Sequence, residues 1–128
     1  MLNIKKMLRK IARCCYTTGV DGVWSWKKYA DGTFEAWRVS DTSSTGSMTQ
    51  LGSTGIYYST VSKVDFPAIG ITSIKSCEWT IAPQDNFIMS CFINRLTASS
   101  VYMGYLRFGS GVAASNMNTR CHITGTWE

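Results

Sequence analysis

The chain has 128 residues, of which 45% are hydrophobic and 12% aromatic, which suits one domain with its own core and excludes a two-domain enzyme. Charged residues make up only 16%, while Gly, Ser and Thr are plentiful, a composition typical of short strands joined by turns and not of a mostly helical protein. No apolar run approaches the ~18 to 20 residues that a membrane-spanning helix needs.

The net charge of +5 is concentrated near the N-terminus. The first 18 residues contain no acidic side chain and five basic ones, which are Lys5, Lys6, Arg9, Lys10 and Arg13. In the rest of the chain, eight basic residues balance eight acidic residues. Because a nucleic-acid-binding body would carry a basic face of its own, we expect no nucleic-acid partner for it.

Five cysteines, an odd number without any C-x-x-C pair, favour free thiols in a reducing compartment. They are Cys14, Cys15, Cys77, Cys91 and Cys121. The first 15 residues mix charge into every turn, whereas a secretory signal needs an apolar stretch of ~7 residues or more. We therefore expect synthesis in a cytoplasm without export by the general pathway.

The opening segment repeats its apolar residues at helical spacing, and we predict an amphipathic helix over residues 2–15. Spacings of three, four and three residues give the a/d pattern of a heptad, with a Leu and a Cys widening the stripe and basic residues on the other side. Isolated helices shorter than ~12 to 15 residues are marginal in water, so this helix must pack on something.

Three partners are open for this helix. It can pack on its own domain, on copies of itself in an oligomer, or on an anionic membrane or nucleic acid, the last favoured by its cations and disfavoured by an apolar face without Trp or Phe. Ile at a positions with Met at d favours more than two strands. The predicted oligomerisation seam consists of Ile4, Met7, Leu8, Ile11 and Cys14.

The residues that follow switch to the two-residue period of strands. We interpret residues 19–22 as a turn-rich joint, and 23–40 as a hairpin around Asp31 and Gly32 in a two-residue type I′ turn. That turn predicts a Lys28–Glu35 ion pair and one buried face. The buried face would hold Trp24, Trp26, Trp37 and Val39.

Residues 41–54 are too polar for a core element, and we predict a loop there. Further strands are predicted at 56–61, 64–66, 73–82, 87–94, 101–108 and 119–127. Seven or eight short strands separated by turns fit a mainly β fold, an antiparallel β-sandwich or jelly roll with a short N-terminal helix. We divide the chain into a helical segment at 1–18 and a β body at 19–128.

The sequence offers no catalytic pair and no metal site. The single histidine, His122, follows Cys121 in a predicted strand, where neighbours point to opposite faces, so these two cannot act together. One histidine, scattered thiols and unclustered carboxylates match no zinc or calcium spacing. Asp41, Asp65 and Glu78 have no evident structural role, and a glycosidase would need two of them ~5 to 10 Å apart in a cleft. We predict no enzymatic activity, no metal and no cofactor.

One short motif matches a cofactor-binding fingerprint, but the residues that follow it cannot form the elements that this fingerprint needs. Residues 109–114 match the G-x-G-x-x-A pattern of a dinucleotide fingerprint and follow a predicted strand. The fingerprint needs a crossover helix and a second strand after it, and Asn116, Asn118 and Thr119 break any helix in the residues that remain. A flexible Gly/Ser turn is the better interpretation.

The tyrosines are the candidates for ligand contact. Their adjacent or odd spacings in predicted strands place some of them outward, and outward aromatic rings favour interfaces or stack on the apolar faces of ligands such as sugars. The candidates are Tyr57, Tyr58, Tyr102 and Tyr105. Burial between subunits, an ordinary core or surface position, and ligand stacking all remain open for them.

The hairpin carries a resemblance to a known family. The string from Trp24 to Trp37, W-S-W-K-K-Y-A-D-G-T-F-E-A-W, resembles a W-x-Y-x-K-W-x-D-G-T-x-E-x-W pattern of small C-terminal β domains in bacteriophage and prophage tail-fibre, baseplate and head-fibre-like proteins. Trp26 stands where Tyr is common, and Tyr29 where Trp is common. The resemblance continues in outline to about residue 127, with a Phe-Pro step at 66–67, an I-x-S-I string at 71–74 and a final Gly-x-Trp at 125–127.

This resemblance implies a virion structural protein, a trimeric fibre or knob-like appendage of the tail or capsid, made in the host cytoplasm. It would serve particle architecture or host-surface attachment, and its helix would dock it to other virion proteins. An alternative is a carbohydrate-binding or carbohydrate-active virion protein whose site lies between subunits. A third is a cytoplasmic prophage protein that binds a host protein or membrane through its helix.

Overall fold

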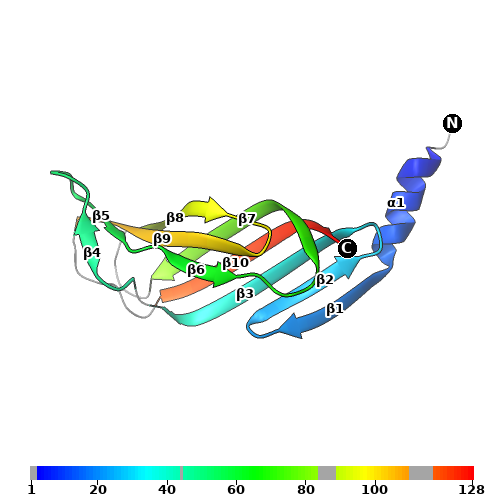
Figure 1. Ribbon diagram of the computed structural model, residues 1–128, viewed down its shortest axis with the longest axis horizontal. Coiled ribbons are helices and arrows are strands. Elements are labelled where there is room, and N and C mark those ends of the chain that lie inside the picture. Colours follow the sequence, from blue (N-terminus) through cyan, green and yellow to red (C-terminus); the bar gives the residue numbers. More distant parts are fainter. Residues whose placement is uncertain (1–2, 44, 84–88, 110–116) are drawn as a thin grey trace.

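The computed structural model describes residues 3–43, 45–83, 89–109 and 117–128, which form one helix and ten strands (Figure 1). The elements are α1 (Ile4–Cys14), β1 (Tyr16–Asp21), β2 (Trp24–Tyr29), β3 (Thr33–Ser43), β4 (Met48–Gln50), β5 (Ile56–Ser59), β6 (Ser62–Asp65), β7 (Ile71–Pro83), β8 (Met89–Leu96), β9 (Ser100–Phe108) and β10 (Met117–Trp127). The helix and the later strands thus lie where the sequence predicted them, with bounds shifted by a few residues.

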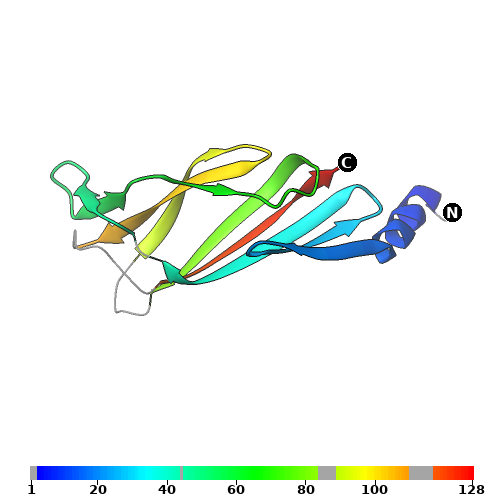
Figure 2. The ribbon, with the colours of Figure 1, turned by 60° about the horizontal axis from the view of Figure 1, so that its bottom comes forward.

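The strands form two antiparallel sheets. Sheet A has the order β1-β2-β3-β10-β7, so the final strand of the sequence lies inside it, between β3 and β7. Sheet B has the order β4-β5-β9-β6, and β8 pairs with β9 as well. The molecule is elongated, with α1 projecting beyond one end and β4 and β5 at the other (Figures 1 and 2).

The core lies between the two sheets and takes side chains from both. Phe34 and Ile123 of sheet A and Val101 and Met103 of sheet B are almost fully buried in one cluster. Trp24 joins them, and its indole Nε1 donates a hydrogen bond to the carbonyl oxygen of Asp65, 2.9 Å away. The mainly antiparallel β class is therefore confirmed, while the jelly-roll topology and the amphipathic character of the helix stay predictions.

The β2–β3 hairpin has a three-residue turn, so the predicted two-residue type I′ turn is wrong. Trp26 pairs with Ala36, and Gly32 N–H donates to the carbonyl of Tyr29 at 3.1 Å, with Gly32 at a φ of 86°. The Asp31 carboxylate accepts hydrogen bonds from the Thr33 amide at 2.9 Å and the Thr33 hydroxyl at 2.6 Å. These bonds stabilise a turn in which glycine takes the left-handed position, as in a hairpin with a bulge.

A register change of one residue moves every side chain of β3 to the other face of the sheet. Phe34 and Ala36 therefore face the core, whereas Trp37 and Val39, predicted to be buried, are 40% and 49% exposed on the outer face. Trp24 and Trp26 do face the core side, as predicted.

The predicted ion pair between Lys28 and Glu35 is wrong for the same reason. Glu35 lies opposite Lys27 and accepts a hydrogen bond from the Tyr29 hydroxyl at 2.9 Å. Lys28 lies on the other face, with its Nζ 3.7 Å from the centroid of the Trp127 ring.

Two polar segments that we predicted to be connections, residues 19–22 and 41–54, contain strands. Residues 19–21 belong to β1, where Gly19 pairs with Trp26 and leaves room for its ring. In the predicted loop at 41–54, β3 continues to Ser43 and β4 covers Met48–Gln50. These strands are held by backbone pairing at sheet edges and bury little apolar surface, so the sequence shows no hydrophobic alternation there.

Candidate assembly and binding surfaces

Helix α1 presents its apolar side chains to solvent. Asn3 Oδ1 accepts a hydrogen bond from the Lys6 amide at 3.1 Å, as an N-cap does. The seam residues Ile4, Met7, Leu8 and Ile11 are between 42% and 63% exposed, and Cys14 is exposed as well. Figure 1 shows the helix extending away from sheet A. In the part of the chain that the structure describes, this apolar stripe is therefore not packed on its own domain.

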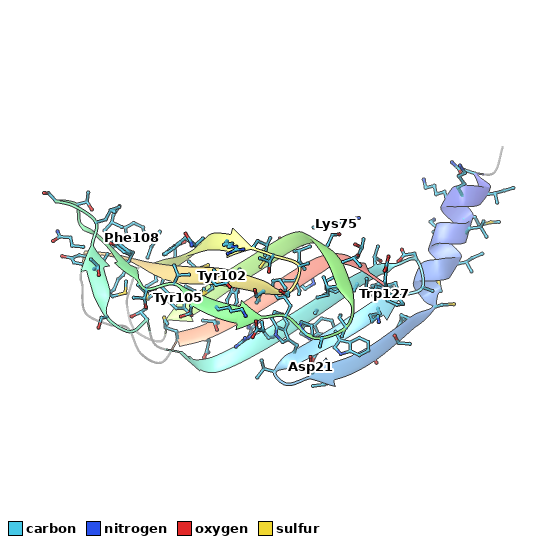
Figure 3. All side chains as sticks on the ribbon, viewed as in Figure 1. Asp21, Lys75, Tyr102, Tyr105, Phe108 and Trp127 are labelled. Atoms are coloured by element: carbon cyan, nitrogen blue, oxygen red, sulfur yellow. The ribbon has the colours of Figure 1, made fainter. Side chains whose placement is uncertain are left out.

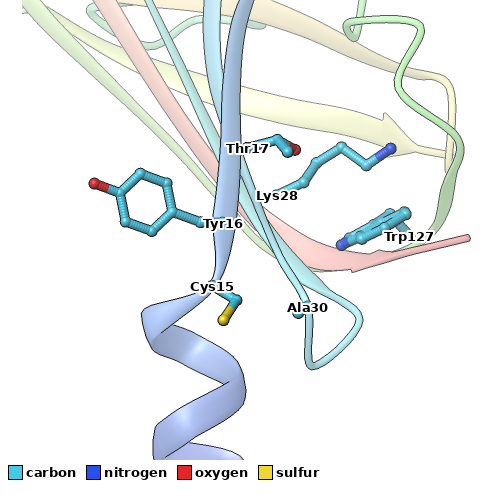
Figure 4. Close-up of a pocket in the computed structure, with 6 residues that line it drawn as sticks. All are labelled: Cys15, Tyr16, Thr17, Lys28, Ala30 and Trp127. Carbon is cyan, nitrogen blue, oxygen red and sulfur yellow. The ribbon is translucent and has the colours of Figure 1, made fainter.

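A shallow apolar cavity of about 240 Å³ lies where the helix meets sheet A (Figure 4). It is lined by Cys15, Tyr16, Thr17, Lys28, Ala30 and Trp127. The Ala30 amide donates to the Cys15 carbonyl at 2.9 Å, which ties the first residue after the helix to the β2–β3 turn. The helix is thus joined to a fixed point of sheet A without a linker.

Aromatic rings and lysines stabilise this end of sheet A on both faces. On the outer face, Lys27 Nζ lies 3.8 Å from the Tyr16 ring centroid, and the Tyr16 and Tyr29 rings meet edge to face. On the inner face, Lys28 covers Trp127, whose Nε1 donates to the Tyr29 carbonyl at 3.0 Å. These contacts join β1, β2 and β10 next to the end of the helix.

The four tyrosine candidates do not line one surface. Tyr58 in β5 is 37% exposed, and its neighbour Tyr57 is half-buried. In β9, Tyr105 packs against the core, while Tyr102 faces the other way, with the Arg95 guanidinium 5.6 Å from its ring (Figure 3). Of the four, Tyr58 is the one that offers an exposed ring.

The outer face of sheet A carries a hollow of about 270 Å³ that the sequence analysis missed. The side chains around it that point outward are Trp37, Val39, Glu78, Thr80, Arg120 and His122. The signal that could have found it is Thr33 directly after the Asp-Gly pair, because an aspartate that caps a residue two positions on favours the longer turn and turns Trp37 outward.

His122 and Cys121 point to opposite faces of β10, as predicted. Cys121 is 2% exposed in the core, whereas the His122 side chain is 43% exposed, with its Nε2 3.8 Å from a Glu35 carboxylate oxygen. Of the unassigned acids, Asp65 pairs with Lys63 at 3.0 Å on the surface. The side chains of Asp41 and of residues 110–114 lie outside the described residues.

Three thiols share the interior, and no disulfide joins the described cysteines. The Cys91 Sγ donates to the Trp79 carbonyl at 3.4 Å, and burial raises the pKa of the Cys91 thiol. A hydrogen bond between Cys77 and Cys121 lowers the pKa of Cys77 and, together with burial, raises that of Cys121. Among the residues that the structure describes, no three His, Cys, Asp or Glu side chains are placed to hold a metal ion.

No described helix combines the length and apolar character needed to cross a membrane. No family model matches the sequence. No curated protein matches it either.

Two solved structures share the fold of this chain. An N-truncated R1-type pyocin tail fibre matches with a TM-score of 0.54 and 13% identity, over 98% of this chain and 97% of that one. A longer C-terminal fragment of the P. aeruginosa R1 pyocin fibre matches with a TM-score of 0.55 and 13% identity, over 98% of this chain and 32% of that fragment. At this identity the likeness concerns the fold, and this chain folds as a domain of R1 pyocin tail fibres does.

Proposed function

We propose that this protein is a structural domain of a phage-type tail fibre, which assembles as a homotrimer on a virion or tail and contributes to host-surface attachment. The observation that carries the proposal is a fold shared with pyocin tail fibres over 98% of the chain. The neutral β body agrees with a structural role.

The helix supplies a means of assembly. Three copies of α1 side by side would bury the stripe of Ile4, Met7 and Ile11 that one copy leaves in water, and each buried apolar Å² contributes about 25 cal/mol. Lys5, Lys6 and Lys10 would stay on the outside of such a bundle, where an acidic surface of another virion protein could meet them.

Light scattering on the full chain and on two charge-matched variants tests the assembly. Wild type should show a mass three times the 14.2 kDa of one chain. Ile11→Glu places a charge in the seam and should reduce the mass to that of one chain at micromolar concentration. Lys6→Gln changes the net charge equally on the far side of the helix and should leave the trimer intact.

The remaining light-scattering outcomes distinguish assembly through the helix from assembly through the β body and from a monomer. A monomeric wild type would overturn the trimer. A trimer that survives Ile11→Glu would place assembly in the β body and leave α1 to bind another virion protein. A deletion used for the same purpose should stop at residue 13, because the Cys15 carbonyl and β1 from Tyr16 onward belong to sheet A.

A further inference from the structure

The outer face of sheet A carries an exposed tryptophan in the middle of a polar row. Across β7, β10 and β3, Glu78 pairs with His122, and His122 pairs with Trp37. Partners on neighbouring strands are ~4.8 Å apart, so a carboxylate, an imidazole and an indole stand side by side. The indole is 40% exposed, although a tryptophan exposes much apolar area at a cost in water.

A second row lies directly beside the first. Thr80 pairs with Arg120, and Arg120 pairs with Val39, all on the same outer face. The two rows enclose the hollow of about 270 Å³. The floor is the centre of a five-stranded sheet, whose backbone pairing sets the positions from which these side chains extend.

The chemistry of the two rows matches a sugar ring. One face of a pyranose is apolar and stacks on an aromatic ring, while its hydroxyls both donate and accept hydrogen bonds. Arg120 provides donors, Glu78 provides acceptors, and the Thr80 hydroxyl can do either. On this face near the indole, the carboxylates of Glu35 and Glu78 are balanced by Lys27, which pairs with Glu35, and by Arg120, a balance that favours a neutral sugar over an anion or a nucleic acid.

We infer that the outer face of sheet A around Trp37 binds a neutral saccharide. Trp37 stacks on the ring, and Glu78, Thr80, Arg120 and His122 bind its hydroxyls. The site follows from the sheet itself, and that the saccharide belongs to a host surface rests on the proposed function.

The test begins with an array of neutral monosaccharides, oligosaccharides and bacterial surface polysaccharides, probed with the full chain. Titration with the bound saccharides then gives affinities for Trp37→Ala, which should weaken binding by about tenfold or more. Trp37→Tyr keeps an aromatic ring and should retain part of the affinity. The matched control is Tyr58→Ala, which removes a ring of similar exposure on sheet B and should leave the affinity unchanged.

Proton–nitrogen NMR locates the contact directly. Five tryptophans give five indole N–H signals, and the signal missing from Trp37→Tyr identifies Trp37. Adding the saccharide should change the chemical shift of this signal more than those of the other four.

Three results would overturn the inference. Absence of binding across the array excludes a saccharide site, and loss of binding in Tyr58→Ala with retention in Trp37→Ala places the site on sheet B. If Trp37→Ala dissociates the trimer in light scattering, the face is a subunit interface, which rejects the saccharide site and leaves the proposed function standing. A monomeric wild type that still binds the saccharide through Trp37 would reject the trimer of the proposed function and leave the saccharide site standing.

Discussion

Gly125 in β10 shows how close the strands of sheet A approach one another. The register between β10 and β7 shifts between Thr124 and Gly125. A Cβ on Gly125 would overlap the Ser73 carbonyl oxygen and lie 2.9 Å from the Phe34 ring. The backbone oxygen belongs to a paired strand and the ring to the core, so neither can move away without loss of packing.

Gly125→Ala should therefore lower the free energy of unfolding by about 3 kcal/mol, because a methyl group forced into a filled site displaces backbone and core together. Urea denaturation followed by tryptophan fluorescence measures this change. Gly55→Ala is the control, since no atom lies within 4 Å of the added Cβ and the change should stay within about 0.5 kcal/mol. Equal losses in the two variants would contradict the steric argument.

The buried thiols make the stability depend on alkaline pH. The hydrogen bond between Cys77 and Cys121 lowers the pKa of Cys77, so this thiol deprotonates first, while the same bond and burial raise the pKa of Cys121. Above pH about 9 the folded pair thus keeps one proton that the unfolded chain, with thiol pKa values near 8.5, has lost. A group with a raised pKa stabilises the fold below its unfolded pKa and loses that contribution as the pH rises.

Through this pair, the free energy of unfolding should fall between pH 9 and 10 by up to about 1.4 kcal/mol per pH unit, in addition to the contribution of Cys91, whose pKa burial also raises. Replacing both Cys77 and Cys121 by Ala removes the coupled pair and its retained proton, and the stability of this double variant should fall less steeply over the same range, whatever its value at neutral pH. Cys15→Ala changes an exposed thiol and should keep the slope of the wild type. Urea titrations at several pH values give the three slopes, and a slope of the Cys77→Ala/Cys121→Ala variant equal to that of wild type would refute the assignment.

At the scale of elements, the strands with an alternating apolar pattern were predictable. In β10, Cys121 and Ile123 face the core while His122 faces out, and in β9 Val101 and Met103 do the same. This alternation arises because one face of the strand is buried, so it can be recognised in the sequence alone. Strands held by backbone pairing at an edge, such as β4, have no alternating hydrophobic pattern.

The register of the β2–β3 hairpin was not predictable from the hydrophobic pattern. Both registers bury two tryptophans of β2, and they differ in whether β3 contributes Phe34 and Ala36 or Trp37 and Val39. Two hydrogen bonds from Thr33 to the Asp31 carboxylate favour the longer turn. Interactions of about 1 kcal/mol each thus favour the register that turns Trp37 outward.

For the whole molecule, the two ends of the sequence differ in how they are held. The Trp127 amide donates to the Gly32 carbonyl at 2.9 Å, and the Glu128 amide donates to the Gly70 carbonyl at 3.0 Å. These bonds fix the end of β10 to the β2–β3 turn and to the segment before β7. Helix α1, by contrast, extends beyond the body (Figure 2).

The integrity of the β body should therefore depend on Trp127 and not on the helix. In an Ile11→Glu background, where assembly through the helix contributes nothing, Trp127→Ala should lower the free energy of unfolding by about 3 kcal/mol, because it removes a half-buried ring together with its hydrogen bond to Tyr29. Removing residues 1–13 should change that free energy by less than about 0.5 kcal/mol, because the stripe of α1 lies in solvent. Urea denaturation of the three proteins measures both effects, and a comparable loss on removing the helix would mean that α1 packs on the body.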